Sequence, residues 1–272
     1  MKVLHVRDYV VNRLQYALNP KSIAVVGASR YETKVGYKVI EGLREWGYKG
    51  EIYPVNPRSD KVHGLKAYPT VKDIPYAVDL VFVAVPAHIV KSVLEDCVAK
   101  KVNIVVIATS AFKEIGRGQL QNDLTQYCRD NKLPLIGPNL VGMGSPYLNF
   151  NCGFIPYLPM EGPVAMISQS GANLLAALGT SQKDHFGMSF FVGLGNKADV
   201  DFCEFVSYAG IDDDTKCLAI YIEGLDSPEG FVEACQKVDK PIVTIKVGGS
   251  KIGVKAAFAH TASENEGTGD AY

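Results

Sequence analysis

Short apolar segments alternate with longer amphipathic segments along almost the whole chain, and this alternation limits the possible folds more than any other feature. Residues 78–85 and 103–109 are nearly continuous apolar runs, as expected for parallel strands that helices cover on both faces. The order of strand, helix, strand and helix predicts an α/β fold with doubly wound parallel sheets. The expected strands cover residues 22–26, 51–55, 78–85, 103–109, 135–137, 164–167, 189–192, 217–222 and 242–246. The expected helices cover residues 35–46, 89–100, 118–131, 173–182, 200–209 and 228–238.

A stretch rich in proline interrupts the alternation near the middle of the chain, with Pro146, Pro156, Pro159 and Pro163 close together. Such a stretch is typical of a domain boundary, so we expect one unit over residues 1–145 and a second over 146–272. Each unit opens with a strand, a turn of small residues and a helix. The two segments are Ile-Ala-Val-Val-Gly-Ala-Ser at 23–29 and Val-Ala-Met-Ile-Ser-Gln-Ser-Gly at 164–171. We therefore expect two nucleotide-binding types of fold in tandem.

Composition excludes several classes of protein. The 28 Lys and Arg residues balance 29 Asp and Glu residues, so no basic surface is expected for nucleic acid or for an anionic membrane. No apolar run approaches the ~20 residues that span a bilayer. The six cysteines are scattered and form no C-x-x-C pair, which favours reduced thiols over a disulfide framework or a zinc site. We expect a cytoplasmic protein without a bound metal and without nucleic acid or membrane partners.

The turn at residues 168–171 carries the most specific local signal. An apolar strand ends in two hydroxyl residues and a glycine, and a helix is expected to follow at once. Backbone N–H groups at a helix start have no intrahelical acceptor, and the helix dipole adds positive charge there, so the turn could bind an anion without a basic side chain. An ordinary strand-to-helix turn with serine as the helix cap would have the same sequence, and the turn alone does not distinguish the two.

The first unit has small residues and prolines at several successive strand ends: Gly27 to Ser29, Val85-Pro86, Ser110 to Phe112, and Gly137 to Asn139. Open α/β sheets place ligands at this edge, so a long ligand could lie along it. NAD is disfavoured, because the first turn lacks G-x-G-x-x-G and the second strand ends in Asn56-Pro57 instead of an acidic residue. Plain turns between strands and helices remain an equally open interpretation.

Further short motifs follow one another along the chain. They are Pro-Lys-Ser-Ile-Ala-Val-Val-Gly-Ala-Ser at 20–29, Lys-Val-Gly at 34–36, Ile-Tyr-Pro-Val-Asn-Pro at 52–57, Val-Ala-Val-Pro-Ala at 83–87, Gly-Pro-Asn at 137–139, Ile-Ser-Gln-Ser-Gly at 167–171, Gly-Asn-Lys-Ala-Asp-Val-Asp at 195–201, Tyr-Ile-Glu-Gly at 221–224 and His-Thr at 260–261. In this order the chain resembles the NDP-forming acyl-CoA synthetases, specifically the α part of ADP-forming acetate–CoA ligase and, more distantly, of succinyl-CoA synthetase. The resemblance covers essentially the whole chain.

The resemblance implies a fold and a set of ligand contacts. It implies a Rossmann-like CoA-binding domain over residues 1–145, followed by a flavodoxin-like parallel α/β ligase domain over 146–272 that carries a phosphohistidine loop. By position it implies CoA contacts from Gly27, Ala28, Ser29, Lys34, Asn56, Pro57, Val85, Pro86, Ser110, Ala111, Phe112 and Asn139. The implied substrates are CoA and a carboxylic acid.

The resemblance also implies how the reaction is carried out. His260 is expected to be phosphorylated transiently and Glu223 to orient it, and the phosphate-binding turn consists of Ser168, Gln169, Ser170 and Gly171. Imidazole suits this task because it is nucleophilic near neutral pH and leaves readily once phosphorylated. The acid is activated as an acyl phosphate, which the CoA thiol then attacks. ATP or ADP and Mg²⁺ are expected on an ATP-grasp subunit or domain, in an oligomeric assembly.

Two features depart from the family pattern or from a self-sufficient enzyme. After His-Thr the family continues with glycine and small residues, whereas this chain has Ala-Ser-Glu-Asn-Glu-Gly at 262–267. No G-x-x-x-x-G-K-[ST] motif occurs, so we expect the chain alone to be inactive as a synthetase. A non-catalytic CoA-binding or regulatory module is therefore the main alternative, and a nicotinamide-dependent oxidoreductase is the second.

Overall fold

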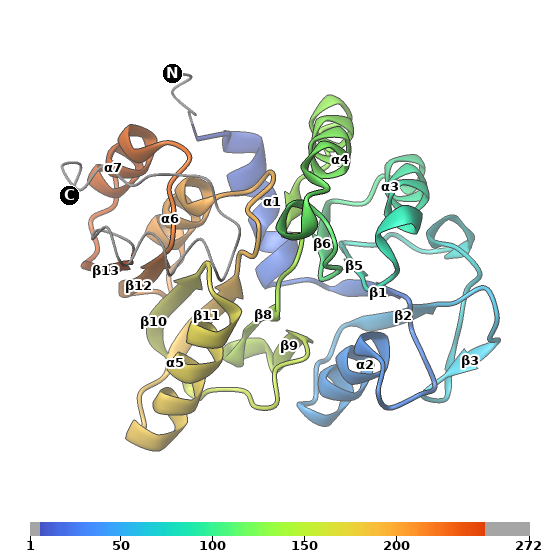
Figure 1. Cartoon of the computed structure of the whole chain (residues 1–272). Coiled ribbons are helices and arrows are strands. Elements are labelled where there is room, and N and C mark those ends of the chain that lie inside the picture. The colour runs from blue at the N-terminus through green and yellow to red at the C-terminus, as the bar shows by residue number, and fades with distance from the viewer. Residues whose placement is uncertain (1–5, 248–272) are drawn as a thin grey trace.

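The apolar segments of the first half form a five-stranded parallel sheet in the computed structural model, which describes residues 6–247 (Figure 1). Its strands are β1 (Ser22–Val26), β2 (Glu51–Val55), β5 (Leu80–Val83), β6 (Ile104–Ile107) and β7 (Leu135–Ile136), in the order β2-β1-β5-β6-β7. Helices α1 (Asp8–Leu18) and α2 (Val35–Glu45) pack on one face, and α3 (Ala87–Lys100) and α4 (Gly118–Asp130) pack on the other. Burial of both faces explains the continuous apolar runs of the strands. A small hairpin, β3 (Lys61–Val62) and β4 (Leu65–Lys66), follows β2.

The second half forms a mixed sheet in the order β13-β12-β10-β11-β8-β9. Strands β10 (Glu161–Ser168), β11 (Met188–Gly193), β12 (Cys217–Ile222) and β13 (Ile242–Lys246) are parallel. Helix α5 (Gly171–Asp184) covers one face, and α6 (Phe202–Ile211) and α7 (Pro228–Gln236) cover the other. The order of the parallel strands is that of a flavodoxin-like sheet. In both sheets the strand order reverses beside the first parallel strand, between β1 and β5 and between β10 and β12.

The segment expected to be irregular contributes two antiparallel strands to this sheet. Strand β8 (Gly142–Ser145) pairs with both β11 and β9 (Phe150–Gly153). The expectation of a purely parallel second sheet is therefore wrong at this edge. The two strands lie unusually close together at this pair, because a Cβ on Gly142 would lie 2.7 Å from the Cα of Gly153. Glycine-rich strands of this kind lack the apolar alternation by which strands are recognised in a sequence.

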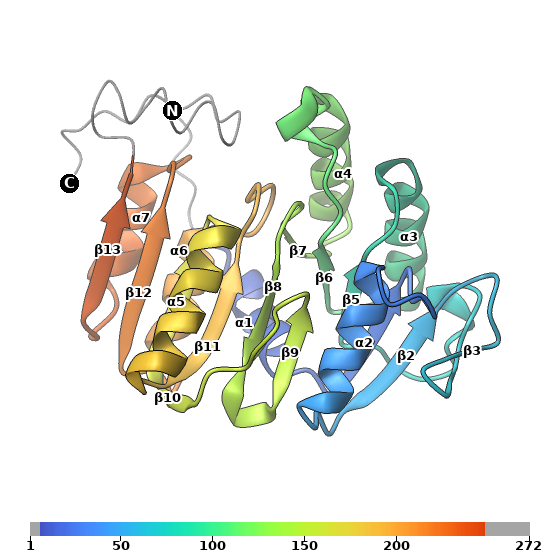
Figure 2. The same cartoon turned by 60° about the horizontal axis from the view of Figure 1, so that its bottom comes forward.

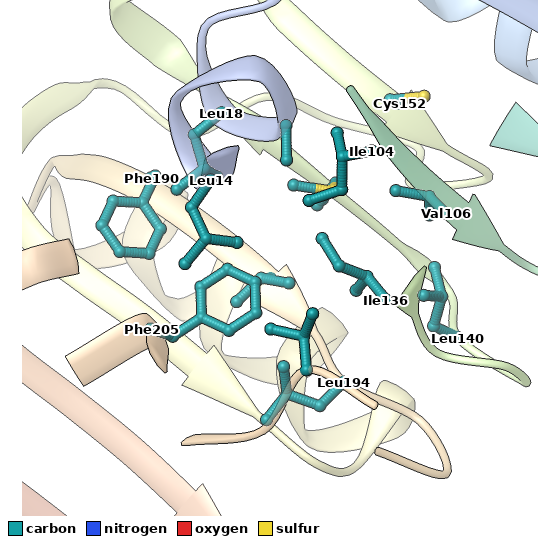
Figure 3. Packing of buried hydrophobic residues seen from close by; sticks show 14 of the residues in the cluster. Leu14, Leu18, Ile104, Val106, Ile136, Leu140, Cys152, Phe190, Leu194 and Phe205 are labelled. Atoms are coloured by element: carbon teal, nitrogen blue, oxygen red, sulfur yellow. The ribbon is translucent and has the colours of Figure 1, made fainter. Parts of the chain in front are cut away.

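Helix α1 was not expected from the sequence, and it joins the two halves. Its buried face includes Val10, Leu14 and Leu18, and it packs against β6 of the first sheet and α6 of the second half. Figure 3 shows Leu14 lying among Ile104, Phe190 and Phe205, so one hydrophobic core runs through both sheets. Helix α2 in turn packs against β9 (Figure 2). The chain passes between the sheets after Ile136, and the boundary near residue 145 stays a prediction.

Helix starts follow from capping side chains. Asp201 accepts a hydrogen bond from the N–H of Phe202 at 2.6 Å, and Glu204 accepts one from the N–H of Asp201 at 3.1 Å. The Asp201 side chain also accepts from the backbone N–H of Glu204, so Asp201 and Glu204 form a capping box, which explains why α6 begins at Phe202 and not at the expected Val200. Within residues 6–247, no helix has the combination of length and apolar composition needed to cross a membrane.

Candidate functional site

A cavity of about 1040 Å³ opens at the carboxyl ends of β1, β2, β5 and β6. This is the edge at which open α/β sheets place their ligands. The cavity is lined by most of the residues that the sequence associated with CoA, namely Gly27, Ala28, Ser29, Lys34, Asn56, Pro57, Val85, Pro86, Ser110 and Ala111. The structure therefore brings these residues together at one edge, while the contacts themselves stay a prediction.

Two glycines let the first turn and the following helix approach closely. Gly27 has a φ of +89°, and a Cβ there would lie 2.4 Å from the carbonyl oxygen of Ala84. A Cβ on Gly36, in the first turn of α2, would lie 2.1 Å from the carbonyl oxygen of Gly27. Any larger residue at either position would push the helix start away from the strand ends. Both glycines thus keep the N-terminus of α2 at the cavity.

Asn56 holds the first turn in place through both ends of its side chain. Its Nδ2 donates to the carbonyl oxygen of Ala28 at 2.7 Å, and its Oδ1 accepts from the N–H of Arg58 at 2.8 Å. The amide therefore connects the ends of β1 and β2, and it shapes the cavity wall as well as lining it.

The cavity also contains cationic groups that the sequence analysis missed. Arg58 and Arg117 line it together with Lys34. Among the described residues, no side chain caps the N-terminus of α2 or of α3, so the N–H groups at both helix starts can donate to an anion. Arg58 directly follows Asn56-Pro57 and could have been found by extending the strand end by one residue. Arg117 is the N-cap residue of α4, far from any strand end, and carried no such signal.

A second cavity, of about 680 Å³, lies at the carboxyl ends of β10, β11 and β12. Gln169, Ser170 and Gly171 line it together with Glu223, as the predicted convergence of the 168–171 turn with Glu223 requires. Gln169 joins them directly, because its Oε1 accepts from the N–H groups of Glu223 and Gly224, each at 3.0 Å. Ser170 caps α5 by accepting from the N–H of Asn173.

Several predicted residues lie elsewhere than expected. Ser168 is fully buried, and its hydroxyl donates to the carbonyl oxygen of Ser170 at 2.7 Å, so it stiffens the turn instead of facing the cavity. Phe112 is also fully buried, in the core beneath the first sheet. Asn139 lines the second cavity and not the first. His260 lies outside the described residues.

A buried lysine borders the second cavity. Lys197 places its Nζ 2.6 Å from Asp226 Oδ2 and 3.8 Å from Asp201 Oδ1. Burial by itself would lower the pKa of Lys197, but the carboxylates of Asp201 and Asp226 outweigh it and raise the pKa above its usual range. The ammonium group therefore stays charged at neutral pH and lies on the wall of the cavity.

The two cavities adjoin, because Val35, Ala108 and Ser110 line both. Glu114 lies at this junction. Its Oε1 accepts from the N–H groups of Ala111 and Phe112, and its Oε2 accepts from Asn196 Nδ2 at 2.8 Å. Partial burial alone would raise the pKa of Glu114, but the hydrogen bonds from Asn196 and the two backbone groups lower it below its usual range. The carboxylate is therefore ionised at neutral pH.

Comparison with known proteins finds one domain family in each half of the chain. The CoA-binding domain family matches residues 21–145, and the succinyl-CoA ligase like flavodoxin domain matches residues 161–268. Acetate–CoA ligase [ADP-forming] of Methanocaldococcus jannaschii is 39% identical over 94% of this chain and 36% of its own length. The α subunit of acetate–CoA ligase [ADP-forming] II of Pyrococcus furiosus is 40% identical over 92% of this chain and 55% of its own.

A solved structure is similar over the same extent. The dinucleotide forming acetyl-coenzyme A synthetase 1 of Ca. Korarchaeum cryptofilum, in complex with phosphate and ADP, has a TM-score of 0.89 at 37% identity. The match covers 94% of this chain and 56% of that one. The chain thus spans about a third to a half of the length of these relatives.

Proposed function

The chain belongs to the family of NDP-forming acyl-CoA synthetases, and we propose that it is the CoA-binding α component of such an enzyme. The reaction interconverts a carboxylic acid, CoA and ATP with an acyl-CoA, ADP and phosphate. One observation carries the proposal: a cavity suited to a long ligand with phosphate groups adjoins a second cavity that holds the 168–171 turn. Transfer of an acyl group to a thiol requires both ligands to reach one point, and the shared wall supplies such a point.

The first cavity suits CoA in size and charge. Lys34, Arg58 and Arg117 are cations at its wall, and the uncapped starts of α2 and α3 add backbone donors. Phosphate groups bind well to arginine side chains and to helix N-termini. The rest of the lining is largely small or apolar, with Val85, Pro86 and Ala87 among it, which suits the uncharged part of a long ligand.

In the proposed reaction His260 accepts a phosphoryl group from ATP and passes it to an oxygen of the acid. The N–P bond breaks as the O–P bond forms, which yields an acyl phosphate. The CoA thiolate then attacks the carbonyl carbon, and phosphate leaves with the bonding electrons. The N-terminus of α5 stabilises the charge of the phosphoryl group, and Glu223 orients the imidazole through its second ring nitrogen.

The nucleotide and Mg²⁺ belong, in this proposal, to an ATP-grasp subunit or domain within an oligomer. The naming of the Pyrococcus furiosus relatives as α subunits supports a separate partner. All six cysteines are free thiols, which suits the reducing environment of the cytoplasm.

The proposal is tested with the chain alone and with its ATP-grasp partner. Calorimetry should detect binding of CoA but not of NAD to the chain. Radiolabelled phosphate should pass from ATP to the chain in an acid-labile, base-stable form when the partner is present, and turnover should require acid, CoA and ATP together. Binding of NAD without CoA would contradict the proposal. Binding of CoA without any label transfer would instead identify a non-catalytic CoA-binding module.

A further inference from the structure

Glu114 makes hydrogen bonds to both halves of the protein at the junction of the two cavities. Its two carboxylate oxygens face different partners, since Oε1 accepts from backbone N–H groups of the first half and Oε2 accepts from Asn196 of the second. Glu114 itself lines the second cavity, whereas Ala111, whose N–H it accepts, lines the first. A single side chain thus connects a wall of each cavity.

The two hydrogen bonds that Glu114 accepts from the first half hold an unusual backbone conformation at residue 111. Ala111 has a φ of +78°, in the region that favours glycine, and the next residue, Phe112, is fully buried. The N–H groups of these two neighbours converge on the same oxygen of Glu114. A non-glycine residue keeps such a conformation only when its surroundings determine it. Glu114 is therefore one of the contacts that set the shape of residues 110–112 at the first cavity.

The hydrogen bond from Asn196 to Glu114 connects to residues 194–201 of the second half, which other contacts also hold. Asn196 also donates to Gln121 Oε1 at 2.9 Å and accepts from Asn139 Nδ2 at 3.3 Å. A short distance along the same segment, the buried Asp199 accepts from Arg7 at 2.6 Å and from Arg129 at 2.8 Å. Residues 194–201 include Lys197, which borders the second cavity. Asn196 itself lines the second cavity, so a shift of Glu114 is passed through this hydrogen bond to the wall of that cavity.

We propose that Glu114 is a positioning residue that couples the two cavities, so that a ligand held against residues 110–112 in the first cavity orders residues 194–201 at the second. The inference rests on the proposed function, because it takes CoA as the ligand of the first cavity. Glu114 acts through Ala111 and Asn196, and it transfers no proton or group itself.

The test exchanges the donor and acceptor of the Glu114–Asn196 hydrogen bond. In Glu114→Gln, the side-chain oxygen can still accept from Ala111 and Phe112, but the new amide meets the amide of Asn196 with two donors. In Asn196→Asp, two carboxylates face each other. The double variant restores one donor and one acceptor, because the amide introduced at position 114 can donate to the carboxylate introduced at position 196. Asp123→Asn is the matched control, a carboxylate-to-amide change on an exposed face of α4.

The measurement is hydrogen exchange of residues 194–201 with and without CoA, together with calorimetry for CoA affinity. In the unaltered chain and in Asp123→Asn, CoA should slow exchange there by about fivefold or more, the low end of typical coupling between sites. With CoA at a concentration that saturates each protein, as calorimetry establishes, each single variant should lose that protection. The double variant should regain it.

Two results would overturn the coupling. One is protection that persists in both single variants, and the other is protection that the double variant fails to regain. A third result, the absence of any CoA binding to the unaltered chain, would instead overturn the proposed function from which the coupling follows.

Discussion

The turns that open the two halves start from the same strand–turn–helix pattern but treat the helix N-terminus in opposite ways. At the first turn, Gly27 has a positive φ, and no described side chain caps α2. At the second, Ser170 caps α5 by accepting from Asn173. The neighbouring Gln169 is held by hydrogen bonds to the backbone of residues 223 and 224.

The charged side chains around the two turns also differ. Lys34, Arg58 and Arg117 border the first cavity, which is the larger one. Carboxylates border the second, namely Glu114, Glu223 and Asp226, with Lys113 and Lys197 as its cations. The first turn thus leaves its donors for a large anionic ligand. The second is a rigid turn in which Ser170 takes up the N–H of Asn173, and in the proposed reaction the start of α5 suits a small phosphoryl group brought by another residue.

The largest expected effect separates the phosphoryl site from the CoA site. Changing His260→Ala should lower label transfer from ATP by about four orders of magnitude or more, as removal of a nucleophile usually does. CoA affinity should stay unchanged, because the first cavity is intact. His185→Asn is the control, since His185 follows α5 as its C-cap with a φ of +55° that asparagine tolerates. Acid-labile label on the His260→Ala protein would contradict the assignment.

The next effect tests whether the first turn depends on close backbone approach. Gly27→Ala should lower CoA affinity about tenfold or more. It should also lower the free energy of unfolding by about 1–3 kcal/mol beyond Gly64→Ala, because the new Cβ meets Ala84. Gly64 shares the positive φ, at +78°, but a Cβ there meets nothing within 4 Å.

The corresponding change at the second turn should be mild. A Cβ on Gly171 would lie 3.1 Å from a side-chain carbon of Val141, so Gly171→Ala should alter the free energy of unfolding by less than about 1 kcal/mol. Chemical denaturation of the three variants measures the contrast. Equal losses for Gly27→Ala and Gly171→Ala would remove the difference between the turns.

A change at Gln169 tests the electrostatics of the second turn apart from its geometry. Gln169→Glu keeps an oxygen that accepts from the N–H groups of Glu223 and Gly224, so the free energy of unfolding should change by less than about 0.5 kcal/mol. The added negative charge beside Glu223 should slow phosphoryl transfer about tenfold. Single-turnover labelling and denaturation measure the two quantities.

Gln169→Leu gives the opposite pattern, because it leaves both backbone N–H groups without this acceptor. It should lower the free energy of unfolding by about 1–3 kcal/mol. Phosphoryl transfer in Gln169→Glu at the rate of the unaltered chain would show that charge at this turn is unimportant.

The smallest expected effect concerns how the stability contributed by Glu114, at the junction of the two cavities, depends on pH. The pKa of Glu114 is lowered in the folded protein from its ordinary value of 4.5. Its ionised form therefore adds stability that is fully present above pH 4.5 and is lost as the pH falls through the lowered pKa. Thermal unfolding should show the unaltered chain more stable than Glu114→Gln at neutral pH. The difference between their unfolding temperatures should shrink in acid. A gap that widens on acidification would contradict the lowered pKa.

Much of the fold was predictable because its signals are local. The boundaries of β1, β2, β12 and β13 agree with the predicted strands, since each is an apolar run whose ends the neighbouring residues mark. Placement of ligand-binding turns at strand ends followed from the parallel order alone. Helix α1 could have been found from the spacing of Val10, Leu14 and Leu18, which matches a helical face. The β8–β9 hairpin carried no comparable signal.

The sequence by itself determined which segments are strands and helices and which turns end at the ligand edge, because short-range periodicity and glycine or proline positions decide these. Only the tertiary structure decided that α1 joins the two sheets in one core and that Asn139 belongs to the second cavity. The link between Glu114 and Asn196 was also decided there. These features depend on contacts between residues far apart in the chain, where packing and donor–acceptor geometry select the partner and no local pattern records it.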